Sequence, residues 1–369
     1  MGSPSSILIF YMKKIVNSYN EWDKLEEVIV GCGIPTNIPA IDFTFKMFFH
    51  DNLIGINKVK HEILKNHIDE HNEDIESFSE LLKSLGVIVK RPKVPDKIHK
   101  VKTHSWNSEV HPSLNVRDLT VIIGDEIIET PTSCRWRYYE TDFMKHLFLD
   151  YFNKGAKWTQ VPKPIMTDMS FDMSYIEKTG GIINRKESYM DCGYEIMFDA
   201  ANMMRFGKHI LFNCSNENSR MGMKWLQRHL GDKHVVWGID ICDNHIDSSI
   251  LPLKPGLCIV TREDFWHKLP TPLQRWDKIY IPQINRTAEE LQSQGIKLAS
   301  PKIELNVFSI SPELIICHPN YEKILNQKLK PYGISAIGSR MRHCEIFAGA
   351  HHCTTLDIRR NGSMEDYFT

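Results

Sequence analysis

The feature that most constrains the fold is a short pattern that recurs four times along the chain. Each copy has an apolar segment, a turn at Gly or Pro and a second apolar segment, as in a β-hairpin. The copies span Asp118–Thr130, Asp199–Asn213, Asp247–Val260 and Asn306–His318. Helical stretches such as Tyr138–Phe152 and Met221–Leu230 lie between them. Repeated hairpin-plus-helix units are typical of modules around an axis, so the sequence predicts a pseudo-symmetric α/β fold. The alternative is an ordinary α/β protein that contains several hairpins.

The first residue of each copy suggests a shared site. Three copies begin with an aspartate, and the fourth begins with Asn306. In symmetric modules these positions lie at the same end, so Asp118, Asp199 and Asp247 are expected to converge near the axis. Three converging carboxylates repel one another unless a cation lies between them. A metal ion or a guanidinium would serve, and the lack of a Cys or His cluster beside all three disfavours a transition metal.

The segments before the first hairpin add further predicted elements. Glu21–Gly31 is predicted to be a turn followed by a strand. An imperfect amphipathic helix over roughly residues 58–85 is expected to end at Gly86. The next strand is predicted within Val87–Pro92. The stretch Val94–Pro112 is rich in His, Lys, Ser and Pro and is predicted to be loop.

Composition excludes several classes of protein. The 369 residues carry a net charge of −1 with scattered Lys and Arg, which predicts no nucleic-acid partner. The nine cysteines form no Cys-x-x-Cys pair, which disfavours a disulfide framework and a Cys-rich zinc site and favours a reducing, cytoplasmic location. The apolar run Ile7–Met12 is too short to span a bilayer, so no membrane partner is expected. Residues 1–16 are interpreted as an N-terminal extension or cloning remnant, and residues 17–369 as a single domain.

One cysteine near the C-terminus has the surroundings of a nucleophile. Cys353 follows the small residues 348–350, which would let a substrate approach the backbone closely. Alone it is weak evidence, because most cysteines are inert and buried. His245 and Asp247 lie two apart, and on a strand that spacing points both side chains to one face. A His with a carboxylate partner is a candidate general acid/base, and a surface His in a turn is the alternative.

Two other histidine pairs are interpreted without a functional role. His67 and His71 are four apart, as in a helical metal pair, but lack the Glu of a zincin and are predicted to be solvated. His351 and His352 adjoin Cys353, but neighbouring residues on a strand point to opposite faces, so a shared zinc ion is not expected. Neither histidine pair predicts a metal site, and we expect no metal and no organic cofactor.

The sequence resembles the arginine:glycine amidinotransferase family over nearly its whole length. The segments that carry the resemblance occur in order and are SYNEWDKLEEVIVG, VRDLTVIIGDEIIE, GAKWTQVPKP, FDAANMMRFGKHI, the HID of His245–Asp247 and HCTTLDIRRNG. Within the family the chain is most similar to the cyanobacterial toxin-pathway branch, with saxitoxin-pathway enzymes first and cylindrospermopsin-pathway enzymes second. The resemblance implies a homodimer and a five-bladed α/β propeller with pseudo-fivefold symmetry, in which the strand within Glu21–Gly31 belongs to the fifth module.

The resemblance also implies roles for residues in the reaction. Cys353 matches the family's nucleophile, and His245 matches its acid/base histidine. Asp199 and Asp118 match carboxylates that bind the guanidinium. Asp247 matches the carboxylate beside the histidine.

Further matches concern the ends of the substrates. Ser300 matches a serine near the amino-acid end of the substrate. Asn244 stands where mammalian members have a larger Met, at a position expected to shape the acceptor pocket. Mammalian members hold the donor carboxylate with an Arg, but Asp264 stands there in this chain, and Arg262 is the expected substitute. A family tyrosine near the same place corresponds to Pro112.

The implied reaction transfers the amidino group of L-arginine to an amine acceptor through an amidino-cysteine, and it releases L-ornithine with ping-pong kinetics. The acceptor expected first is an arginine-derived amino ketone of saxitoxin biosynthesis, and glycine is the alternative. Three other interpretations stay open: a hydrolase that releases citrulline, a non-catalytic guanidine-binding protein and a Cys/His metallohydrolase.

Overall fold

The computed structural model describes residues 14–34, 42–48, 63–171, 195–242, 245–283 and 297–369, and within them five small sheets share one topology. Four sheets are β5 (Thr120–Ile123), β6 (Glu126–Glu129) and β7 (Lys157–Gln160); β8 (Met203–Phe206), β9 (His209–Asn213) and β10 (Val235–Ile239); β11 (Ile250–Lys254), β12 (Leu257–Val260) and β13 (Asp277–Tyr280); β14 (Phe308–Ser311), β15 (Leu314–Cys317) and β16 (Ser335–Gly338). In each, an antiparallel hairpin is followed by a third strand that pairs parallel to the second.

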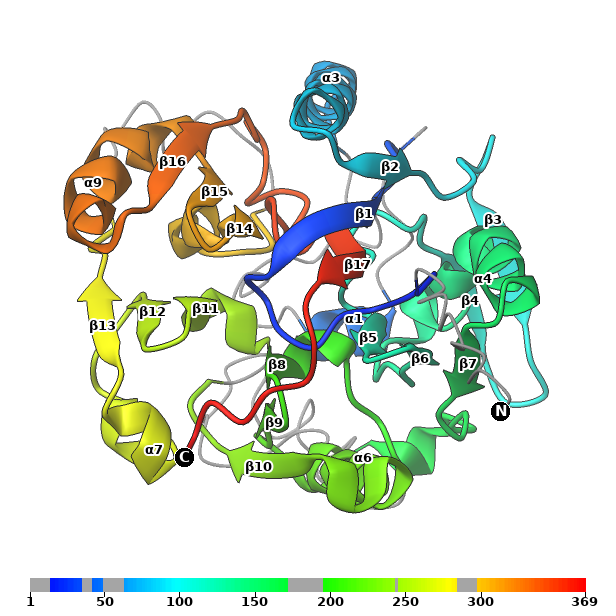
Figure 1. The fold of residues 1–369 in the computed structure, drawn as a ribbon. Coiled ribbons are helices and arrows are strands. Elements are labelled where there is room, and N and C mark those ends of the chain that lie inside the picture. The colour runs from blue at the N-terminus through cyan, green and yellow to red at the C-terminus, as the bar shows by residue number, and fades with distance from the viewer. Residues whose placement is uncertain (1–13, 35–41, 49–62, 172–194, 243–244, 284–296) are drawn as a thin grey trace, which may run out of the picture.

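The fifth sheet joins the two ends of the described chain. It consists of β17 (Thr355–Asn361), β1 (Lys24–Val30) and β2 (Ile88–Lys90). β17 pairs antiparallel with β1, and β2 pairs parallel with β1, so the topology of the other four sheets is repeated. Figure 1 shows the five sheets following one another around the molecule. The four hairpins and the fifth module are therefore confirmed, whereas a propeller as a closed shape stays a prediction.

Helices connect the second strand of each sheet to the third. They are α3 (Lys65–Ser84), α4 (Lys145–Asn153), α6 (Glu217–Leu230), α7 (Thr271–Gln274) and α9 (Pro319–Leu329). α3, α4, α6 and α9 pack against the third strand of their sheets, and they lie on the outer side of their sheets in Figure 1. The chain leaves α3 through Gly86, whose φ of +82° lies in the left-handed region that favours glycine.

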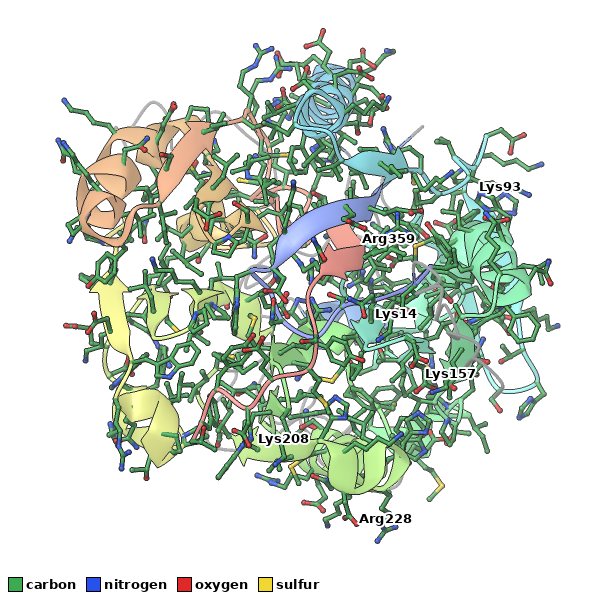
Figure 2. All side chains as sticks on the ribbon, in the orientation of Figure 1. Lys14, Lys93, Lys157, Lys208, Arg228 and Arg359 are labelled. Atoms are coloured by element: carbon green, nitrogen blue, oxygen red, sulfur yellow. The ribbon has the colours of Figure 1, made fainter. Side chains whose placement is uncertain are left out.

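The described residues also contain several short helices. They are α1 (Phe43–Phe48) and the 3₁₀ turns η1 (Arg135–Arg137), η2 (Glu140–Met144), η3 (Asp168–Ser170), η4 (Ala200–Asn202), η5 (Gly231–Lys233), η6 (Ile246–Ser248), η7 (Trp266–Lys268), η8 (Pro301–Leu305) and η9 (Lys330–Tyr332). Within the part of the chain that the structure describes, every helix is too short or too polar to cross a bilayer. Lys93 and Arg228 lie on different edges of the molecule in Figure 2, in keeping with scattered cationic side chains.

Two predictions about local structure are wrong. The stretch Val94–Pro112 contains a hairpin of β3 (His99–Lys102) and β4 (Asn107–Val110). The Thr103 hydroxyl oxygen accepts the backbone N–H of Trp106 at 3.0 Å and so closes the turn. The Trp106 side chain is buried and donates to the Ile165 carbonyl at 2.9 Å, so this polar stretch is held by a tertiary contact.

The second wrong prediction concerns His67 and His71. Both were expected to be solvated, and both are buried. They lie on the face of α3 that packs against the loop before Cys353, where the His71 ring stacks on Phe347 with centroids 4.0 Å apart. Burial lowers the pKa of His71 to about 3, so the ring is neutral at physiological pH. The prediction failed because charged residues flank both histidines in the sequence, although the two side chains lie on the helix face that points into the protein.

A buried network of ion pairs joins several sheets. The Arg205 guanidinium in β8 lies 2.7 Å from both Glu21 Oε2 and Asp357 Oδ2. Arg117 pairs with Asp357 at 2.6 Å, and Arg360 pairs with it at 2.8 Å. Although burial opposes ionisation, the charge of Arg205 holds the pKa of Asp357 well below its usual range. The network fixes the strand that follows Cys353.

Candidate active site

The residues that precede the first strands of the five sheets meet at one place. Asp118, Asp199, Asp247, Asn306 and Cys353 stand two to four residues before β5, β8, β11, β14 and β17. All five are buried. The repeats therefore bring together the three aspartates, as their positions in the sequence predict, and they add an amide and a thiol.

A cavity of about 250 Å³ opens onto this group. Its polar lining includes Asp118, Asp247, His245 and Cys353. Its apolar lining includes Phe45, Phe48, Trp136, Leu298, Ile303 and Phe347. The cavity thus places a thiol, an imidazole and two carboxylates next to a surface that suits a carbon chain.

The partner of His245 differs from the one that the sequence predicts. His245 Nε2 lies 2.9 Å from Asp199 Oδ2, and Nδ1 lies 3.8 Å from Asp118 Oδ1. Asp247 has other partners, because His245 caps the 3₁₀ turn η6 and the two-residue spacing of a strand does not apply. Although burial opposes a charge on the ring, the carboxylates of Asp118 and Asp199 raise the pKa of His245 to about 9. The imidazole is therefore protonated at neutral pH.

Asp247 lies between the thiol and a second histidine. Its Oδ2 accepts from His352 Nδ1 at 2.8 Å and from Asn306 Nδ2 at 3.0 Å, and it lies 3.4 Å from Cys353 Sγ. Although burial opposes ionisation, the hydrogen bond from His352 and its charge lower the pKa of Asp247 to about 2. Asp247 is thus a carboxylate at every physiological pH.

The site is built to attract a cation that carries several N–H groups. Burial raises the pKa of Asp118 to about 6, so this group is mostly ionised at neutral pH. Burial, together with the charges of Asp247 and Asp118, raises the pKa of the Cys353 thiol well above its ordinary value. Asp118 Oδ1 and Asp247 Oδ1 are buried and accept no hydrogen bond from the described residues. A guanidinium would satisfy both oxygens with charge-assisted bonds.

The other predicted site residues differ in whether they line the cavity. Ser300 is exposed and lines the cavity just before η8. Asp199 lies behind His245 and is not one of the lining residues. Arg262 is not brought to the cavity either, since it pairs with Asp264 at 3.1 Å and donates to the Ile241 carbonyl. Asn244 lies outside the described residues.

Several residues of the site could not be assigned from the sequence. His352 is buried in the turn before β17, where the strand geometry assumed from the sequence does not apply, and its Nδ1 lies 2.8 Å from Asp247 Oδ2. Arg137 donates to Asp118 Oδ2 at 2.8 Å and to both oxygens of Glu140, and so positions that aspartate. Asn306 was marked only by its place at the start of the fourth repeat. That place was the signal that could have identified it.

Comparisons with known proteins agree with this geometry. No family model matches the chain. The L-arginine:L-lysine amidinotransferase of Pseudomonas savastanoi pv. phaseolicola is 31% identical over 98% of this chain and 99% of its own length. The structure of an inosamine-phosphate amidinotransferase from Streptomyces griseus has a TM-score of 0.84 at 29% identity and covers 97% of this chain and all of its own.

A third relative comes from a toxin pathway. The structure of SxtG, an amidinotransferase from Microseira wollei in the saxitoxin biosynthetic pathway, has a TM-score of 0.82 at 32% identity. It covers 95% of this chain and 99% of its own. The matches extend over nearly the full lengths of the chains. The chain belongs to the amidinotransferase family.

Proposed function

We propose that the protein is an amidinotransferase that moves the amidino group of L-arginine to an amine acceptor through an amidino adduct on Cys353 and releases L-ornithine. The observation that carries this proposal is the shared cavity of Cys353, His245, Asp118 and Asp247. The thiol can attack, the histidine can move a proton, and the carboxylates can hold the guanidinium.

Substrate binding would also activate the nucleophile. Asp118 Oδ1 and Asp247 Oδ1 accept hydrogen bonds from the guanidinium, which holds its central carbon near Cys353 Sγ. The two carboxylates keep the pKa of the free thiol high, so a bound cation offsets their charge and favours loss of the thiol proton to solvent, which leaves the thiolate. The thiolate is the reactive form of cysteine.

The protonated His245 supplies the next step. It donates its proton to the nitrogen that leaves as the δ-amino group of ornithine, and an amidino-cysteine remains. The neutral imidazole then accepts a proton from the incoming amine, whose nitrogen attacks the amidino carbon and releases Cys353. Asp199 holds the ring at 2.9 Å through this exchange. The Phe48 ring lies 5.8 Å from the His245 ring and helps to keep water from the adduct.

For the acceptor we propose an arginine-derived amino ketone. The similarity to the saxitoxin-pathway amidinotransferase supports this class. Arg137 is the sole Lys or Arg among the described lining residues, and Asp118 and Glu140 engage it. These walls favour an acceptor with an apolar chain over one with a carboxylate or phosphate. We propose that Ser300, at the rim, contacts the amino-acid end of arginine.

Product analysis tests the reaction. Purified protein incubated with arginine alone is expected to release ornithine, up to one equivalent, and to carry an amidino group on the Cys353 peptide. Addition of one amine from a panel that includes glycine, lysine and an amino ketone is expected to discharge the adduct and to restore turnover. Ornithine, citrulline and the peptide mass are followed by mass spectrometry. Citrulline as the main product would indicate a hydrolase, and no product and no adduct would indicate a guanidine-binding protein.

The affinity for arginine is expected to fall in acid. Burial raises the pKa of Asp118 to about 6, so below this pH the carboxyl becomes protonated and loses its charge. In a Cys353→Ala variant, which cannot form the adduct, the dissociation constant of arginine should rise about tenfold per pH unit below that value. Titration calorimetry between pH 5 and 8 measures it. In the same background, the Asp118→Asn variant should bind arginine weakly at every pH. If the protein that retains Asp118 bound arginine with the same affinity at every pH, the role of Asp118 would be contradicted.

A further inference from the structure

The fourth repeat differs from the other hairpin repeats at the residue before its first strand. Asp118, Asp199 and Asp247 carry carboxylates at this position, whereas Asn306 carries a neutral amide of nearly the same shape. Asn306 is 1% exposed, so its amide needs partners inside the protein.

Both ends of the Asn306 amide have a partner. The side-chain oxygen accepts the backbone N–H of Cys353 at 2.9 Å, and Nδ2 donates to Asp247 Oδ2 at 3.0 Å. The backbone carbonyl of Asn306 also accepts the N–H of His352 at 3.2 Å. An ionised carboxylate has acceptors only, so an aspartate here could keep the bond to Cys353 but would lose the bond to Asp247. The contacts of this position need an amide.

The bond to Asp247 helps to orient that carboxylate. Its Oδ2 faces three groups, namely Asn306 Nδ2, His352 Nδ1 and the Cys353 thiol. Its Oδ1 is buried and accepts no hydrogen bond within the described part of the chain. Since Asp247 lines the cavity, saturation of one oxygen leaves the other for the substrate.

The neutral charge of Asn306 matters because the thiol already faces negative groups. Asp247 and Asp118 both disfavour the thiolate of Cys353. His352 stands behind Asp247 with Glu21 Oε2 3.5 Å from its Nε2, and His245 lines the same cavity. A further carboxylate next to Cys353 would make its thiolate still less stable.

We propose that Asn306 is a positioning residue of the nucleophile, whose amide binds Cys353 and Asp247 together without adding a charge beside the thiol. The kinetic part of its test rests on the proposed function, whereas the chemical part requires only a reactive cysteine.

The chemical test compares rates of Cys353 alkylation by iodoacetamide between pH 7 and 9.5, followed by the mass of the Cys353 peptide. Asn306→Asp places two carboxylates about 3 Å apart, and one of them keeps a proton until the pH is raised. In the upper part of the range the added charge is expected to slow alkylation about tenfold or more, because one pKa unit of the thiol changes the thiolate fraction tenfold. Asn306→Ala adds no charge and should not slow it.

A matched control is Asn216→Asp. Asn216 caps α6 through the N–H of Ser219, and aspartate caps helices equally well, so this variant should be alkylated at the wild-type rate. Equal rates for wild type and Asn306→Asp, or equal slowing by Ala and Asp, would overturn the proposal and assign position 306 to packing.

The kinetic test uses Asn306→Ala and does not depend on the folding of the aspartate variant. Loss of the bond to the Cys353 backbone misplaces the thiol, so kcat is expected to fall on the order of 10²-fold. KM for arginine is expected to rise by a smaller factor, because Asp247 loses one of the bonds that orient it. An unchanged kcat in folded protein would overturn the proposal. A wild-type protein without any transfer activity would contradict the proposed function, and the alkylation comparison would still decide the role of Asn306.

Discussion

Replacement of Cys353 by serine is expected to reduce amidino transfer about 10⁴-fold or more, because a serine hydroxyl in this site stays protonated and attacks poorly. The variant should still bind arginine through Asp118 and Asp247, which keep their positions in the cavity. Ornithine release under saturating arginine and the mass of the intact protein measure the outcome. The adduct should be absent.

The control for this change is Cys214→Ser. Cys214 is a buried cysteine directly after β9 whose thiol points to the Phe212 carbonyl at 3.5 Å, a bond that a hydroxyl can also make. This variant should keep nearly full activity and should still form the adduct. A Cys353→Ser protein with more than about a tenth of wild-type activity would contradict covalent catalysis by this residue.

Replacement of Arg205 by methionine is expected to lower the free energy of unfolding by about 3–5 kcal/mol, because it leaves buried carboxylates without their partner. The guanidinium bonds to Glu21 and Asp357, and it also donates to the Ser18 hydroxyl at 2.7 Å and the Ile122 carbonyl at 2.8 Å. Chemical denaturation followed by circular dichroism measures the change. Since Asp357 lies in β17, directly after Cys353, activity should fall with stability.

Arg220→Met is the matched control for the buried network. Arg220 is half-exposed and pairs with Glu217 at 3.3 Å on the surface of α6, and such a pair contributes roughly 0–1 kcal/mol. If both variants lost the same small amount, the buried network would not be a main source of stability. A stable Arg205→Met protein would also indicate that water or rearranged side chains satisfy Glu21 and Asp357.

The sequence by itself determined the repeating part of the fold. Hairpins depend on local signals, namely apolar segments on either side of a turn residue. Gly207 and Gly256 are such turn residues, and their φ values of +67° and +83° are ones that glycine adopts readily. These turns can therefore be predicted without knowledge of tertiary contacts. The same repetition predicted that Asp118, Asp199 and Asp247 converge, because equivalent positions in repeated units lie at equivalent ends.

The tertiary structure alone decided which side chains pair. His245 bonds to Asp199, 46 residues earlier, and Asp247 bonds to His352, 105 residues later. Neither pairing follows from local spacing, since each joins the ends of different sheets. Packing also decides that His71 is buried and that Arg262 does not line the cavity. Local sequence thus specified the units and their turns, whereas the contacts between units, which set the charges around Cys353, exist only once the sheets have assembled.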